Sequence, residues 1–243
     1  MLFYLNSTAN LGDFLNSLPV FSGLSKNYKF SLIIKDEMKK FNGLVELLKF
    51  QNIFDEIYYD TQTFDSVTQI FLISSWTREN KSDDNAPTET CRYENWIRDN
   101  FKQLTFSVDN DFILKVPDYN FDVPKKIVCG DRWVGPDIDN RRKSNILIEF
   151  NKLIQLDFSK SLLYNAYIIK HSLKPFISTF TGIAVLADLL GVEQYVIWGD
   201  DLDNWDNKPI EQSFYKHFYK NRNSSLININ DFRIEYDKLL HRI

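Results

Sequence analysis

Short apolar runs that alternate with longer amphipathic segments constrain the fold of this chain more than any other feature of its sequence. Up to residue 104 the pattern predicts strands over 2–5, 30–34, 54–59 and 70–73, and helices over 13–24, 38–50 and 91–104. Strands and helices in this order form parallel sheets with helices on both faces. We therefore expect the first part of the chain to be a Rossmann-like α/β unit.

A second series of the same kind follows the stretch from Val116 to Pro124, which contains two prolines and shows no clear period. After it, the pattern predicts strands over 127–129, 153–156, 176–177 and 195–198, and helices over 141–150, 161–170 and 182–190. The tail from Pro209 is predicted to form one or two amphipathic helices, the second over 231–241. We expect an α/β protein with two domains, residues 1–116 and 124–243.

Charge and cysteine content limit the classes of protein that this chain can belong to. The net charge of −4 argues against a protein that coats nucleic acid, although a local basic groove is compatible with it. Cys91 and Cys129 are too few for a disulfide framework, which favours a reducing compartment. No apolar run approaches membrane-spanning length, and the N-terminus lacks a secretory signal pattern. We expect a cytoplasmic protein without an integral membrane segment.

The segment Asn10-Leu11-Gly12-Asp13 directly follows the first predicted strand. Ligands of open parallel sheets bind at the carboxyl ends of the strands, so this segment is a candidate site. Gly12 permits a tight turn, and Asp13 at the start of a helix is suited to capping free amides. The alternative is that Asp13 is a general base aimed into a cleft, with Asn10 on the acceptor side. Spacing alone leaves both interpretations open.

A second candidate segment, residues 178–182, lies between a short predicted strand and a predicted helix. Exposed amides and hydroxyls at a helix N-terminus bind anions such as a diphosphate. The residues expected to bind a donor are therefore Ser178, Thr179, Thr181 and Gly182. The plainer alternative is a helix cap followed by a small residue that allows close packing.

Two tryptophan-containing segments end other predicted strands. In Gly130–Pro136, Arg132 is suited to pairing with a phosphate and Trp133 to stacking on a base or sugar. Trp76 follows the strand at 70–73 and is a candidate for the acceptor side. An ordinary turn with a buried tryptophan is the alternative in both places.

Metal and cofactor chemistry have little support in the sequence. The three histidines, His171, His217 and His241, lack the spacing of metal ligands. The phosphate-binding P-loop, the G-x-G-x-x-G fingerprint and the G-x-S-x-G motif are absent. We expect neither a metal nor a cofactor.

Two of these segments together resemble glycosyltransferase family 9, the ADP-heptose:lipopolysaccharide heptosyltransferases. Leu11-Gly12-Asp13, followed by an apolar helix and Leu18-Pro19, is similar to the family's N-terminal motif. The segment from Phe180 to Ala187, continuing to Gly199, is similar to its C-terminal Asp-Thr-Gly-Leu-Ala-His-Leu-Ala motif. The resemblance implies a GT-B arrangement of two Rossmann-like halves, here with the C-terminal half reduced.

The resemblance also implies roles for these residues. Asp13 matches the family's proposed catalytic base, and Gly12, Thr181 and Gly182 match residues near the donor diphosphate. The implied activity is metal-independent, inverting transfer of a hexosyl, heptosyl or pentosyl group from a nucleotide-sugar. Phe180 and Val185 stand where the family has Asp and His, which removes two polar groups from the donor side.

Three functions remain open at this point. The first is transfer to a bacterial surface glycan, as the resemblance implies. The second is a phage-type DNA glycosyltransferase that acts on a hydroxymethylated pyrimidine, with a basic rim formed by Lys125, Lys126, Arg132, Arg141, Arg142, Lys143, Lys216, Lys220 and Arg222. The third is a catalytically inactive nucleotide-binding protein, suggested by Phe180 and Val185. The Asn- and Lys-rich composition suits a bacterium or a phage in a bacterial host.

Overall fold

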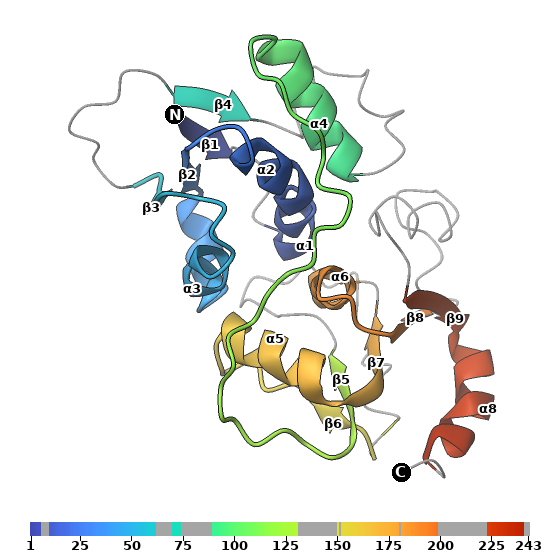
Figure 1. Cartoon of the computed structure of the whole chain (residues 1–243). Coiled ribbons are helices and arrows are strands. Elements are labelled where there is room, and N and C mark those ends of the chain that lie inside the picture. Colours follow the sequence, from blue (N-terminus) through green and yellow to red (C-terminus); the bar gives the residue numbers. More distant parts are fainter. Residues whose placement is uncertain are drawn as a thin grey trace.

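A computed structural model describes residues 1–5, 10–61, 70–73, 89–130, 150, 152–179, 181–198 and 223–240, with only the backbone for 70–73, 89 and 198. Within this part, the chain forms two parallel sheets, one in each half (Figure 1). The predicted α/β class with two Rossmann-like halves is confirmed. None of the helices in the described ranges has the length and apolar character needed to cross a bilayer.

The N-terminal sheet has the strand order β3-β2-β1-β4, and all its neighbouring strands are parallel. Its strands are β1 (Leu2–Leu5), β2 (Ser31–Ile34), β3 (Ile57–Tyr59) and β4 (Ile70–Ile73). The four strands match the apolar runs that predicted them. β1 lies between β2 and β4, so the segment that follows it starts near the middle of the carboxyl edge.

Both helices predicted for the first 50 residues are broken into two pieces. The first comprises α1 (Leu11–Leu15) and α2 (Leu18–Ser25), with Pro19 in the first turn of α2. The second comprises the 3₁₀ helix η1 (Asp36–Lys40) and α3 (Leu44–Lys49). Gly43 separates them with a φ of +83°, a left-handed conformation that glycine adopts readily. α4 (Glu89–Asn100) corresponds to the helix predicted over 91–104.

The C-terminal sheet has the order β6-β5-β7-β8-β9 and is also parallel throughout. Its strands are β5 (Ile127–Gly130), β6 (Ile154–Gln155), β7 (Leu173–Thr179), β8 (Gln194–Trp198) and β9 (Ser224–Asn228). Its helices are α5 (Leu162–His171), α6 (Gly182–Leu189) and α8 (Ile229–Leu240).

The prediction that the tail is entirely helical was wrong at β9. Ser224–Asn228 pairs in parallel with β8, from Gln194 opposite Ser224 to Trp198 opposite Asn228. β9 is an edge strand, and its mostly half-exposed residues include two serines and an asparagine. Such a strand lacks the continuous apolar run that marks a central parallel strand. The helix predicted over 231–241 is present as α8.

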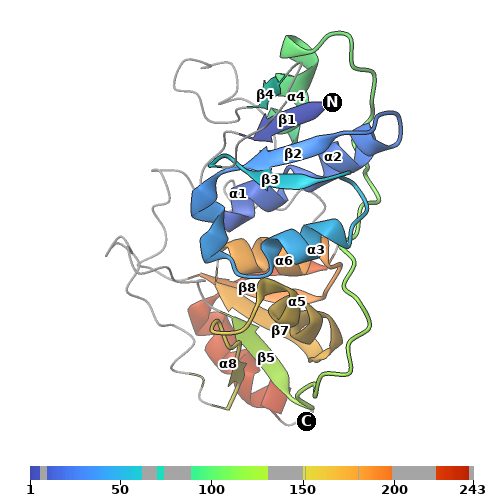
Figure 2. The ribbon, with the colours of Figure 1, turned by 90° about the vertical axis from the view of Figure 1, so that its left-hand side faces the viewer.

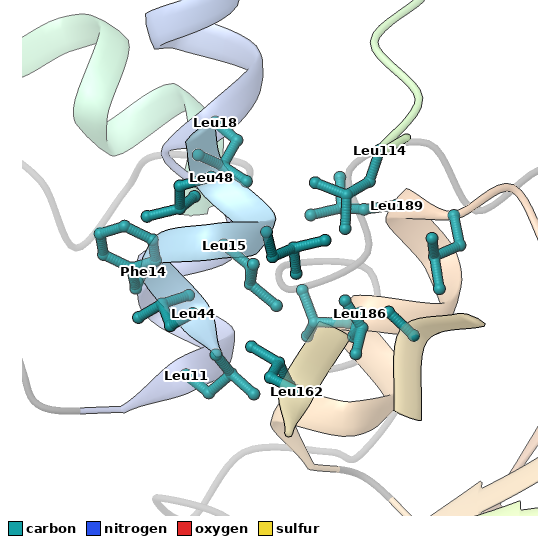
Figure 3. Close-up of a cluster of buried hydrophobic side chains, with 14 of the residues drawn as sticks. Leu11, Phe14, Leu15, Leu18, Leu44, Leu48, Leu114, Leu162, Leu186 and Leu189 are labelled. Atoms are coloured by element: carbon teal, nitrogen blue, oxygen red, sulfur yellow. The ribbon is translucent and has the colours of Figure 1, made fainter. Parts of the chain in front are cut away.

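Helices from both halves lie between the two sheets (Figure 2). α1 and α3 of the first half meet α5 and α6 of the second, and their leucines form one continuous core. Figure 3 shows the labelled members of this core: Leu11, Phe14, Leu15, Leu18, Leu44, Leu48, Leu114, Leu162, Leu186 and Leu189. α8 covers the other face of the C-terminal sheet, where Phe232 packs in a cluster with Ile177 and Ile197.

The segment after α4 connects the halves and is bonded to both of them. Gln51 holds the backbone of Lys115, donating from Nε2 to its carbonyl at 2.9 Å and accepting its amide at 2.8 Å. The amide of the preceding residue, Leu114, donates to the carbonyl of Leu189 in α6 at 2.7 Å. The connection is therefore fixed on the molecule up to the predicted boundary at 116.

Candidate active site

The N-termini of α1 and α6 meet at a pair of glycines, Gly12 and Gly182. A Cβ atom added to Gly182 would lie 2.8 Å from the amide nitrogen of Gly12 and 3.0 Å from the Cβ of Leu11. A Cβ atom added to Gly12 would lie 3.3 Å from both Gly182 Cα and Val185 Cγ2. The two motifs predicted from the sequence are therefore in direct contact. Gly12 lies inside α1 and permits this close approach, rather than forming the turn that we predicted.

Asp13 is the third residue of α1 and is 8% exposed. Its Oδ2 accepts a hydrogen bond of 3.3 Å from Nδ2 of Asn10, the exposed residue that precedes the helix. An acid in the first turn interacts favourably with the helix dipole, so part of the capping interpretation holds. Asn10 contacts this carboxylate, and its side chain makes no capping bond to the backbone of α1 among the described residues.

Thr181 is the N-cap of α6, with an extended backbone at φ −142° and ψ 174°. Its carbonyl accepts the amides of Ala184 at 3.0 Å and Val185 at 3.3 Å. Gly182 and Ile183 precede Ala184 in the first turn of α6, and the N–H groups of a first turn lack intrahelical partners. The Thr181 Oγ1 atom is buried and has no hydrogen-bond partner within the described ranges. This end of α6 therefore has amides without intrahelical partners, which suit an anion, next to a buried hydroxyl without a partner in the described ranges.

Ser178 does not face the site. Its side chain is fully buried, and its hydroxyl donates to Oε1 of Gln194 at 3.2 Å. Gln194 in turn donates to the carbonyl of Ala184 and to the hydroxyl of Ser224. The predicted donor contact from the Ser178 side chain was therefore wrong, because this residue ties β7 to β8 and α6. Thr179 is also buried, at 5% exposure, and pairs with Ile197 in the sheet.

The carboxyl edge of the N-terminal sheet carries a polar network that connects the ends of β1, β2 and β3. The Tyr4 hydroxyl donates to Asp60 Oδ2 at 3.0 Å, and the Asp36 amide donates to Asp60 Oδ1 at 2.9 Å. Thr61 donates to Asp36 Oδ1 at 2.7 Å, and Lys39 pairs with the same carboxylate. Burial, and then the bond to Asp60, raise the pKa of Tyr4, whereas the Lys39 bond lowers the pKa of Asp36.

Several predicted residues lie outside the described ranges: Trp76, Arg132, Trp133, Phe180, and all of the proposed basic rim except Lys125 and Lys126. These two lysines are exposed and directly precede β5, at the amino edge of its sheet. Because the site lies at the carboxyl edge, Lys125 and Lys126 cannot contribute to a basic rim around it. Among the residues with described positions, no group of three or more His, Cys, Asp or Glu side chains could hold a metal ion.

Two residues of α4 that sequence reasoning did not assign to the site contact α1 directly. The Tyr93 hydroxyl donates to the carbonyl of Asp13 at 3.0 Å, and Thr90 Oγ1 donates to the carbonyl of Asn16 at 2.9 Å. Tyr93 lies within the helix predicted over 91–104 and is 1% exposed. No pattern in the sequence indicated which backbone group its hydroxyl would reach.

Solved structures of glycosyltransferases have the same fold. The glycosyl transferase family 9 protein from Veillonella parvula is 10% identical, with a TM-score of 0.58 over 98% of this chain and 88% of that one. E. coli heptosyltransferase WaaC with ADP is also 10% identical, with a TM-score of 0.58 over 98% of this chain and 99% of that one. The iron-containing heptosyltransferase TibC with ADP-D-β-D-heptose is 8% identical, with a TM-score of 0.57 over 100% and 78%.

No family model matches the sequence, and no curated protein matches it. The likeness to the solved structures therefore concerns the fold. It confirms the GT-B-like arrangement of two parallel α/β halves that the resemblance to family 9 implied.

Proposed function

We propose that this chain is a glycosyltransferase that moves a sugar from a nucleotide-sugar to an acceptor hydroxyl with inversion. The contact between Gly12 and Gly182, which sets Asp13 beside the N-terminus of α6, carries this proposal. The reaction needs a base for the acceptor hydroxyl and a site for a departing diphosphate. The residue after Gly12 supplies a carboxylate and the first turn of α6 supplies amides, so the elements that meet at this contact carry groups suited to the two needs. The shared fold with structures that hold ADP or an ADP-heptose adds support.

The donor diphosphate lies over the first turn of α6 in this proposal. The amides of Gly182 and Ile183 and the hydroxyl of Thr181 donate to its oxygens. Gly12 has no side chain and therefore lets the backbone of α1 lie close to the start of α6. The helix dipole and Arg132 offset the charge that develops on the leaving group, so no metal is needed. Fixed donors of this kind act most strongly on charge that appears in the transition state.

Asp13 takes the proton of the acceptor hydroxyl as the oxygen attacks the anomeric carbon. The new C–O bond forms on the face opposite the diphosphate, and the bond between the anomeric carbon and the diphosphate oxygen breaks. The nucleoside diphosphate leaves with that electron pair, which gives inversion. Asn10 holds the carboxylate through its bond to Oδ2. We assign the contacts with the acceptor to Trp76 and Trp133, which lie outside the described residues.

The acceptor that we favour is a bacterial surface glycan. Asp36 and Asp60 at the carboxyl edge of the N-terminal sheet are hydrogen-bond acceptors suited to sugar hydroxyls. The position of Lys125 and Lys126 at the opposite edge removes part of the basic rim that DNA would need.

The role of Asp13 is tested by Asp13→Asn, with Asp118→Asn on the exposed connecting segment as the charge-matched control. We expect Asp13→Asn to bind ADP as the wild type does and to lose transfer by about 10²-fold or more, the usual scale for loss of a general base. Asp118→Asn should keep full turnover. Turnover of Asp13→Asn near the wild-type rate would remove Asp13 from the mechanism.

The substrates are tested by measuring nucleotide release from ADP-heptose, ADP-glucose, UDP-glucose and UDP-xylose. Each donor is combined with deacylated lipopolysaccharide core or with hydroxymethylated duplex DNA. We expect release that depends on the glycan. Release that depends only on the DNA would make the chain a DNA glycosyltransferase. Tight ADP binding without release from any combination would support an inactive nucleotide-binding protein.

A further inference from the structure

The helix that carries Asp13 is unusually short because of Pro19. A proline ring clashes with the carbonyl four residues earlier and supplies no amide, and α1 ends at that residue, Leu15. The chain then turns through Asn16 and Ser17 before α2 begins. Both the amide and the hydroxyl of Ser17 donate to the carbonyl of Phe14, at 3.0 and 2.6 Å. The break leaves carbonyls near the end of α1 to be satisfied from elsewhere.

α4 supplies hydroxyl groups to two of these carbonyls. Tyr93 donates to Asp13 at 3.0 Å and Thr90 donates to Asn16 at 2.9 Å. Each donor is 1% exposed, and their spacing of three residues places them on one face of α4. Buried hydrogen bonds hold their geometry because no water replaces a lost partner. α1 is therefore fixed to α4 at the residue that bears the candidate base.

We infer that Tyr93 is a positioning residue for Asp13, an inference that rests on the proposed function. The backbone of Asp13 is held on one side by the contact of Gly12 with Gly182 and on the other by the Tyr93 hydroxyl. The Asn10 amide then restrains the carboxylate itself. With the backbone fixed, few side-chain torsions remain free. Displacement of a catalytic group by about 1 Å can lower a rate by roughly 10²-fold.

Tyr93→Phe tests the inference by removing only the hydroxyl, with Tyr28→Phe as the matched control. Tyr28 also bonds the backbone through its hydroxyl, accepting the Thr105 amide at 2.9 Å, but lies away from the site. With ADP-heptose or the fastest donor of the panel, we expect kcat of Tyr93→Phe to fall about 10-fold. Its KM for the donor and its Kd for ADP should stay within about twofold of the wild type, because the α6 contacts are unchanged. Tyr28→Phe should keep the wild-type kcat.

The double variant with Asp13→Asn distinguishes positioning from general support of the fold. If Tyr93 acts through Asp13, adding Tyr93→Phe to Asp13→Asn lowers kcat no further. A further fall of kcat in the double variant overturns the inference and leaves the proposed function in place. The same holds if Tyr93→Phe alone keeps the wild-type kcat while Asp13→Asn alone is impaired. A fully active Asp13→Asn overturns the inference and removes Asp13 from the mechanism, whereas absence of turnover by the wild type with every donor and acceptor overturns the proposed function.

Thr90 and amide hydrogen exchange keep the inference testable if Tyr93→Phe does not fold or no donor turns over. Thr90→Val should lower kcat, and Thr90→Ser, which keeps the hydroxyl, should restore it. In the absence of substrate, Tyr93→Phe should accelerate exchange of the amides of residues 11–17, whereas Tyr28→Phe should not. Unchanged exchange over 11–17 in Tyr93→Phe, or equal rates for the two Thr90 variants, would show that α4 does not hold α1 in place.

Discussion

Gly12 and Gly182 bring the two halves of the molecule within van der Waals contact at the ends of two helices, without a side chain between them. The two positions differ in the space that they leave for a Cβ atom. At Gly182 the nearest atom would be the backbone nitrogen of Gly12, at 2.8 Å, whereas at Gly12 the nearest atoms would lie at 3.3 Å. Backbone atoms on a packed helix cannot move aside as a flexible side chain can. The two positions should therefore differ in their tolerance of a methyl group.

The first prediction is that Gly182→Ala is more damaging than Gly12→Ala. Gly182→Ala should destabilise the protein by about 1–3 kcal/mol, the usual cost of overpacking, and should weaken ADP binding by separating α1 from α6. Gly12→Ala should cost less, because its Cβ would lie 3.3 Å from Gly182 Cα and Val185 Cγ2, so the neighbouring atoms need to shift by only a few tenths of an ångström. Urea denaturation and calorimetric titration with ADP measure the two effects.

Gly23→Ala is the control for this comparison. An added Cβ at Gly23 would lie 1.9 Å from the carbonyl oxygen of Ser107, within the N-terminal half. This variant should also be destabilised, but the protein that folds should bind ADP as the wild type does. Equal ADP binding by Gly182→Ala and the wild type would show that the glycine contact does not shape the site.

The second prediction concerns the two halves as folding units. Residues 1–116 expressed alone would expose the leucines that face α5 and α6, among them Leu11, Leu15 and Leu44. A contiguous exposed apolar surface of this kind binds hydrophobic dyes and promotes aggregation. We expect the fragments 1–116 and 124–243 to bind 1-anilinonaphthalene-8-sulfonate separately and to form a complex that binds less of it when coexpressed. Cooperative unfolding of an isolated fragment at wild-type stability would show that the halves are independent domains.

The sequence predicted most strands and the start of α6 because these elements carry compact apolar runs bounded by polar residues. The same reasoning did not find the breaks at Pro19 and Gly43, although proline and glycine are known to interrupt helices. Apolar spacing continues across each break because both pieces of helix pack on the same core. A periodic pattern therefore reports the buried face more faithfully than the length of a helix.

The candidate site was only partly predictable for a related reason. A motif gives the positions of side chains along the chain, whereas their direction depends on the register of the strand. Ser178 was assigned to the site from its place before Gly182, but its side chain points into the sheet toward Gln194. The bond from Tyr93 to Asp13 joins residues 80 positions apart, a separation that no local pattern encodes.

The third prediction is that Gln51 stabilises the molecule by holding the connecting segment. Its Nε2 donates to the carbonyls of Leu47 at 2.7 Å and Lys115 at 2.9 Å, and its Oε1 accepts the Lys115 amide at 2.8 Å. Gln51→Ala should lower the free energy of unfolding by about 2 kcal/mol, because it leaves partly buried backbone groups unpaired. Urea denaturation measures this loss.

Gln51→Glu and Gln103→Ala are the comparisons for this variant. The carboxylate in Gln51→Glu can accept the Lys115 amide but faces two carbonyls without a proton to donate, so it should destabilise at least as much as Gln51→Ala at pH 7. Gln103 is exposed, and its replacement by Ala should change stability by less than about 0.5 kcal/mol. If Gln51→Ala behaves as Gln103→Ala does, the connecting segment is held by its apolar contacts instead.

The fourth prediction is a pH dependence of stability that originates at Asp188. Burial near the C-terminal end of α6 raises the pKa of this carboxyl from 3.8 to about 6, while the hydrogen bond from Ser224 acts in the opposite direction. The Ser224 hydroxyl donates to Oδ1 at 2.7 Å. A negative charge is also unfavourable at this end of a helix dipole. The folded protein therefore favours the protonated form.

Because the folded pKa lies above the unfolded one, the stabilising contribution of Asp188 is complete below pH 3.8 and is lost as the pH rises through about 6. A shift of this size corresponds to about 3 kcal/mol between the two limits. Asp188→Asn cannot ionise, and its amide oxygen can still accept the Ser224 hydroxyl. The stability of the wild type relative to Asp188→Asn should therefore fall by about 2 kcal/mol between pH 4 and pH 7, the part of the full difference that lies in this window.

Urea denaturation of both proteins at the two pH values measures this relative change, in which the effects of all other titrating groups cancel. Asp99→Asn on the exposed face of α4 is the control, and its stability relative to the wild type should stay constant within about 0.5 kcal/mol. A constant difference between Asp188→Asn and the wild type would mean that Asp188 ionises in the folded protein as freely as in the unfolded chain. The bond from Ser224, together with solvent, would then be sufficient to stabilise the charged carboxylate of Asp188 near the C-terminal end of α6.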